Sequence, residues 1–153
     1  MKSKIEFGRQ GNFIVALLLL HFVFFGYLCN IYLKEFIELK VLFLYQAIFD
    51  PAAILSGFIL FGIVFFMVFR ENFYEYGIRN SIWLIPFIIV MSWIWYWFIY
   101  GFDILMIPMY FIRIETYINI LVLLGINLLA ALLAAIAKES YARFVRRIKE
   151  IET

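Results

Sequence analysis

The fold of this chain is decided most clearly by residues 117–137, which read YINILVLLGINLLAALLAAIA. These 21 residues include no Asp, Glu, Lys or Arg. As an α-helix rising about 1.5 Å per residue, they would span the hydrocarbon core of a bilayer, which is about 30 Å thick. A helix satisfies its own backbone hydrogen bonds, so it can lie in lipid. The stretch therefore predicts a transmembrane helix.

Three further apolar runs of similar length, residues 13–33, 51–69 and 81–101, precede this one. The whole chain of 153 residues is 67% hydrophobic and 22% aromatic, more apolar surface than a soluble fold can bury. At about 20 residues per crossing, four spans leave little room for another domain. We therefore predict an all-α membrane protein: one integral membrane domain over residues 1–153, built as a four-transmembrane-helix bundle.

The basic residues predict the orientation of the bundle. Ten of the 13 Lys and Arg residues precede the first run, separate the second from the third, or follow the fourth. The other three, Lys34, Lys40 and Arg113, lie in the two remaining connections. Because cytoplasmic loops carry an excess of Lys and Arg, we expect the N- and C-termini to be cytoplasmic. The net charge of +2 and the placement of the basic residues give no reason to expect a nucleic-acid partner.

The two outer connections are unusual because they are themselves apolar, over residues 41–49 and 104–112. Such segments would be unfavourable in water, so we expect them to lie in the membrane interface, with a partner-binding or lid role as the alternative. Pro108 makes a continuous helix over residues 104–112 less favourable. The inner connection, residues 70–80, is predicted to be a short loop.

The C-terminal segment, residues 138–152, is predicted to form a basic amphipathic helix. Its apolar residues share one stripe, and its basic residues are Arg143, Arg146, Arg147 and Lys149. Two interpretations remain open: a helix bent along the inner membrane surface, and a docking site for a cytoplasmic partner.

Polar residues inside the apolar runs are candidates for a function, because burying one in hydrocarbon is costly without a partner. Aligning the runs by depth places His21, Ser92 and Asn127 near one midplane. We expect Asn127 to bond to His21 or Ser92 and to fix helix register, since no carboxylate accompanies these residues to make a proton relay. A haem held by His21 and Met91 is not favoured, and no cofactor is predicted.

Two groups of small residues predict close approach of helices. The spacing of small side chains in the second and fourth runs is the small-xxx-small pattern of packed membrane helices. These contacts would lie within one protomer or between protomers. The residues are Ala53, Gly57, Ala130, Ala131, Ala134 and Ala135.

Three acidic residues, Asp50, Asp103 and Glu115, are expected near the outer surface. Together they would suit a cation or a lipid-modifying enzyme. Solvated charges at span ends are the preferred interpretation, with Asp50 capping the second helix ahead of Pro51. Since Cys29 is the single cysteine, no disulfide or cysteine-built metal site within the chain is expected. No catalytic or metal site is predicted.

The sequence thus predicts a non-enzymatic multi-pass membrane protein. Its expected partners are the lipid bilayer and either further copies of itself or other membrane subunits. It would act by association, as a homo-oligomer or as a small accessory subunit of a membrane complex. The alternative is a small channel or transporter whose pathway forms on oligomerisation.

Overall fold

A computed structural model of the chain describes residues 3–29, 48 and 54–151. No strand occurs in these parts of the chain, and nearly all of their residues are helical. The elements are α1 (Ser3–Leu19), the π-helix η1 (Leu20–Cys29) that continues it, α4 (Ile54–Arg70), α5 (Tyr74–Tyr100), α6 (Met106–Ile112) and α7 (Ile114–Ile151).

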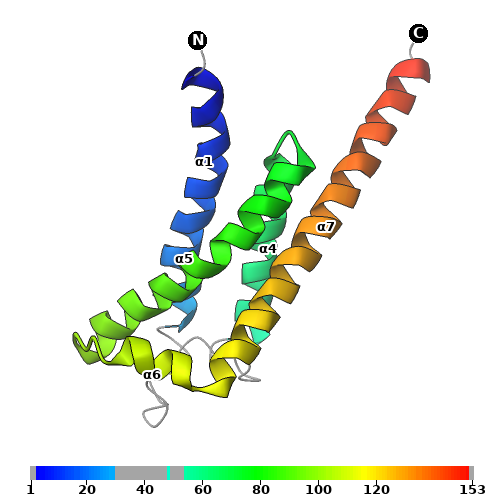
Figure 1. Cartoon of the computed structure of the whole chain (residues 1–153). Helices are drawn as coiled ribbons and strands as arrows, with labels where there is room; N and C mark the ends of the chain where they lie inside the picture. Colours follow the sequence, from blue (N-terminus) through cyan, green and yellow to red (C-terminus); the bar gives the residue numbers. More distant parts are fainter. Residues whose placement is uncertain (1–2, 30–47, 49–53, 152–153) are drawn as a thin grey trace.

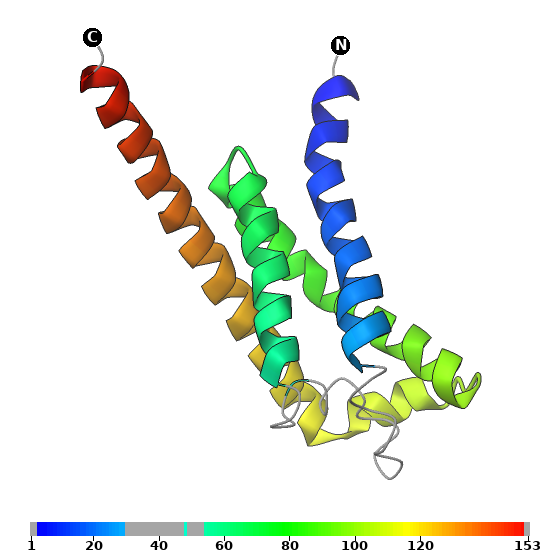
Figure 2. The ribbon, with the colours of Figure 1, turned by 180° about the vertical axis from the view of Figure 1, so that it is seen from behind.

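The long helices form an open bundle in which α4 lies between α1 and α7 and contacts both (Figures 1 and 2). Helix α5 crosses this group obliquely, so that its C-terminal end lies beyond α1. Helix α6 then returns along that end of the molecule to α7. Both termini lie at the opposite end, with the turn between α4 and α5.

Helices α5 and α7 are long and apolar enough to cross a membrane, with windows of mean hydropathy 2.0 and 2.7. Only 33% of that window is buried in α5 and 28% in α7. A core helix of a soluble protein would be mostly buried, whereas most residues in these two windows are exposed or only partly buried. The apolar helices α1–η1 and α4 are shorter. The all-helical fold is therefore compatible with a membrane protein.

The inner connection is shorter than expected, because α5 begins at Tyr74 rather than near Ser81. The predicted loop of residues 70–80 is therefore wrong for most of its length. The turn is closed by backbone bonds from Glu71 N to the Val68 carbonyl and from Gly77 N to the Phe73 carbonyl. Gly77 is buried against Val68, so α4 and α5 pack closely from the first turn of α5 onward.

Helix α7 is a single element of 38 residues and shows no break at Lys138. The expected C-terminal amphipathic helix is therefore the last part of α7, and the interpretation of a separate helix bent along the membrane is wrong. Neither Gly nor Pro occurs from Lys138 to Ile151, so nothing in the sequence ends or kinks the helix there. This part of α7 projects past the turn between α4 and α5 (Figures 1 and 2).

The second outer connection contains a helix, α6, in spite of Pro108. Pro108 is the third residue of α6, and the N–H groups of a first helical turn have no partner within the helix, so its missing N–H costs little. Asp103 Oδ1 accepts a bond of 2.9 Å from Leu105 N just before α6. Of the first outer connection, residues 41–49, all but Ile48 lie outside the described residues.

Candidate functional site

The polar residues of the apolar runs do not meet as predicted. Asn127 is fully buried and donates from Nδ2 to the Ser81 carbonyl, at 2.8 Å. Ser92 donates to the Ile89 carbonyl of its own helix, at 2.6 Å. The His21 ring lies against Trp95, with 5.4 Å between ring centroids. The expected bond from Asn127 to His21 or Ser92 is therefore wrong, because oblique α5 brings an earlier turn to Asn127.

We predict that Asn127→Leu changes stability little. The substitution removes one interhelical hydrogen bond, which averages about 0.6 kcal/mol in membrane helices. It also removes Asn127 Oδ1, which is buried without a partner and whose burial is itself unfavourable. The free energy of unfolding in detergent should therefore fall by less than about 1 kcal/mol. A loss well above this would show that Asn127 is essential to helix register.

The small residues of α7 serve contacts inside the chain. Ala130, Ala131 and Ala134 are completely buried in the core that α7 forms with the other helices. Ala135 is partly exposed. The other predicted packing face consists of Ala53 and Gly57. Ala53 lies outside the described residues. Gly57 has no atom within 4 Å of where a β-carbon would lie, so it makes no close helix contact there.

Gly57 instead borders an apolar hollow between α4 and α7, with a volume of about 450 Å³. Its walls are apolar side chains of both helices and Ile48. Nothing polar among these residues gives the hollow a chemical preference. The lining residues are Ile48, Ile54, Gly57, Phe58, Phe61, Val122, Ile126 and Leu129.

The outer acidic residues do not form a site in the described parts of the chain. Asp103 is exposed, and its backbone carbonyl accepts a bond of 2.9 Å from Trp97 Nε1. Glu115 lies in the first turn of α7, where a negative charge interacts favourably with the helix dipole. Asp50 is among the residues that are not described. Across the described ranges, no group of three or more His, Cys, Asp or Glu residues could hold a metal ion.

A buried polar group holds α6 against the bundle. The Tyr110 hydroxyl accepts a long bond of 3.5 Å from Asn119 Nδ2, and Thr116 donates to the Tyr110 carbonyl. Burial raises the pKa of Tyr110, although the bond from Asn119 opposes this shift. The Tyr110 ring meets Trp93 of α5 edge-on, at 5.7 Å between centroids. These contacts explain why α6 packs inward, and they expose no reactive group.

Sequence reasoning missed Glu71, which is only 2% exposed at the turn between α4 and α5. Its Oε1 accepts a bond of 3.4 Å from Asn12 of α1, and its backbone carbonyl accepts one from the Lys138 ammonium of α7. One residue thus links the turn to both flanking helices. No local signal marks it, because its partners lie 59 and 67 positions away.

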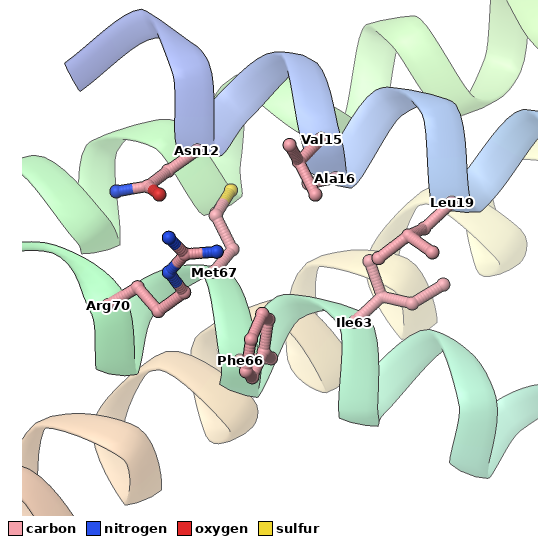
Figure 3. Close-up of a pocket in the computed structure, with 8 residues that line it drawn as sticks. All are labelled: Asn12, Val15, Ala16, Leu19, Ile63, Phe66, Met67 and Arg70. Atoms are coloured by element: carbon pink, nitrogen blue, oxygen red, sulfur yellow. The ribbon is translucent and has the colours of Figure 1, made fainter. Parts of the chain in front are cut away.

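Helices α1 and α4 pack closely beside this link. Figure 3 shows Asn12 and Ala16 of α1 facing Met67 and Arg70 of α4. The remaining space is about 10 Å³, which is no more than one water needs. This contact is therefore part of the bundle and not a ligand site.

A larger groove lies on the other side of the turn, against α7, with a volume of about 460 Å³. Apolar side chains form most of its wall, and Asn72, Tyr74, Lys138 and Glu139 lie at its polar part. Small-molecule sites commonly have volumes of about 300–1,000 Å³. The apolar lining residues are Val68, Ile78, Leu132, Ala135, Ile136 and Ala142.

Beyond this groove, the last part of α7 exposes both apolar and basic side chains. Tyr141 is 62% exposed, Phe144 61% and Ile148 41%. Among the basic residues, Arg143 pairs with Glu139 at 3.3 Å. Arg146, Arg147 and Lys149 are exposed.

The described surface therefore has a groove and exposed apolar and basic side chains on the last part of α7, near the turn between α4 and α5. Comparison with protein-family models, curated proteins and solved structures finds no match to this chain.

Proposed function

We propose that this chain is a multi-pass membrane protein that acts by association through the projecting part of α7. Its partner is a second copy of the chain or another subunit of a membrane complex. The observation that carries the proposal is the exposed apolar stripe of Tyr141, Phe144 and Ile148 on a helix that continues past its own bundle. No catalytic activity is part of this proposal.

The membrane setting is supported by the outward apolar surface of α5 and α7. Helices α1–η1, α4, α5 and α7 would then be the four crossings. Both termini and the turn between α4 and α5 lie at one end, and the connections at this end carry ten of the 13 basic residues. By the positive-inside rule, this end is cytoplasmic.

The stripe continues the face by which α7 packs inside the bundle. Steps of seven residues, or about two helical turns, connect Ala134 to Tyr141 and Ile148. Ala134 is completely buried, whereas Tyr141 and Ile148 are exposed, because α4 and α5 reverse at residues 71–73. Spacings of three and four residues suit a helix–helix seam. The Tyr141 ring still lies against Phe69 of α4, with 6.5 Å between ring centroids. Exposed apolar residues that continue along α7 beyond this contact fit an intermolecular surface.

We predict that Phe144→Glu combined with Ile148→Glu dissociates the assembly. Burying each such side chain contributes about 1.5–3 kcal/mol, so losing two should weaken association at least about a hundredfold. Native mass spectrometry of protein extracted gently from its own membrane measures the assembly mass and any co-purified subunit. Arg146→Glu is the matched control, because it adds a negative charge on the opposite face of α7.

Association through α7 is contradicted if the double variant keeps the mass and subunits of the unsubstituted protein. It is equally contradicted if the unsubstituted protein is monomeric and without partners at every concentration. Retention of the assembly in Arg146→Glu, with loss in the double variant, would support the stripe as the contact surface.

The alternative, a small channel or transporter whose pathway forms on oligomerisation, draws no specific support from the described residues. Asn127 and Ser92 direct their donor groups to backbone carbonyls, and such bonds stabilise helices rather than conduct an ion.

A further inference from the structure

The groove between the turn and α7 is lined by polar and by apolar side chains. Asn72 and Tyr74 lie at the turn between α4 and α5, and Lys138 bonds to the Glu71 carbonyl of the same turn. Leu132 and Ile136 precede Lys138 on α7 and line the groove on the side toward α6. This order of side chains matches that of a phospholipid, whose polar headgroup lies at the membrane surface and whose chains run inward.

The groove has one basic side chain, Lys138, and no carboxylate of the described residues forms an ion pair with it. Within the described residues, the Lys138 ammonium bonds to the Glu71 backbone carbonyl, which is neutral. Glu139 also borders the groove, but its carboxylate is already paired with Arg143. An ammonium with three donors and one neutral partner favours an anionic ligand such as a phosphate.

We propose that this groove binds one anionic phospholipid from the cytoplasmic leaflet. Lys138 contacts its phosphate, Asn72 and Tyr74 donate hydrogen bonds to its headgroup, and Val68, Ile78, Leu132 and Ile136 contact an acyl chain. This inference rests on the proposed membrane setting. It does not rest on the proposed association, because the groove and the stripe occupy different faces of α7.

The test is native mass spectrometry of the full chain in detergent, titrated with phosphatidylglycerol or with phosphatidylcholine of identical acyl chains. The unsubstituted protein should bind one phosphatidylglycerol in preference. Since a basic residue near an anionic lipid surface contributes about fivefold in affinity, Lys138→Gln should lose about that much of the preference. Lys149→Gln is the matched control, because Lys149 does not border the groove, and it should keep the preference.

A second variant, Ala135→Phe, tests the groove independently in case Lys138→Gln does not fold. Ala135→Phe fills the groove from its apolar wall and leaves Lys138 in place, so it should reduce binding of both lipids. Excess inorganic phosphate should leave the phosphatidylglycerol adduct intact. If inorganic phosphate displaces phosphatidylglycerol, the groove is a free-phosphate site and the proposal is overturned.

Equal binding of the two lipids, or an unchanged preference in both Lys138→Gln and Ala135→Phe, would also overturn it. Loss of a protein dimer in Ala135→Phe would instead identify a second copy as the occupant. The same spectra report assembly mass and lipid adducts separately. Failure of the lipid site is thereby distinguished from failure of association through α7.

Discussion

Replacing Ala131 with leucine is expected to destabilise the protein by about 1–3 kcal/mol, the usual cost of overpacking a well-packed core. Ala131 is completely buried in the cluster that joins α7 to the other helices. Small residues at such contacts let two backbones approach closely, so a leucine has no space unless the helices separate. Thermal unfolding in one detergent, followed by far-ultraviolet circular dichroism, measures the loss.

The matched control is Ala142→Leu, at an exposed position of the same helix. Alanine and leucine have similar helix propensities, so the two substitutions differ mainly in their surroundings. For a chain of this size, 1 kcal/mol corresponds to about 2–4 °C in Tm. Equal melting temperatures for the two variants would contradict the packing of α7 described above.

The second large effect is expected at Gly77, the buried glycine of the first turn of α5. A β-carbon there would lie 2.7 Å from Val68 Cγ1 and 3.4 Å from Val68 Cα. Valine in a helix has essentially one side-chain rotamer, so Val68 cannot turn away and the two helices must shift. Gly77→Ala is therefore expected to cost about 1–3 kcal/mol, more than the propensity gain of up to about 1 kcal/mol.

Gly62→Ala tests the same substitution without the contact. Nothing lies within 4 Å of a β-carbon added at Gly62 in the middle of α4, so the propensity gain should appear alone and raise stability. The two variants should thus move the unfolding midpoint in opposite directions. A stabilising effect at both glycines would contradict the close approach of α4 and α5.

The helices were predictable where the sequence is long, apolar and free of charge. Residues 117–137 lie entirely within α7, and residues 81–100 entirely within α5. The ends of the helices were less predictable, because they depend on contacts. Helix α5 begins at Tyr74 because its first turn packs on α4 through Gly77 and Val68, and no property of residues 74–80 alone reveals that contact.

The partners of polar residues were the hardest part to predict. Depth alignment assumes parallel helices, and it paired Asn127 with His21 or Ser92, whereas oblique α5 presents the Ser81 carbonyl. Glu71 belongs to the predicted loop of residues 70–80, and its burial follows only when α1 and α7 flank the turn. Local spacing indicates which residues share a helix face, but it does not give the crossing angle of two helices.

Helix α7 has a mechanical consequence that follows from its length. Its 38 residues span about 57 Å at about 1.5 Å per residue, nearly twice the thickness of the hydrocarbon core. One end follows α6 directly, and the other end projects beyond the α4–α5 turn. Because α7 is one unbroken helix, a tilt about its buried residues Ala130, Ala131 and Ala134 would move its two ends in opposite directions.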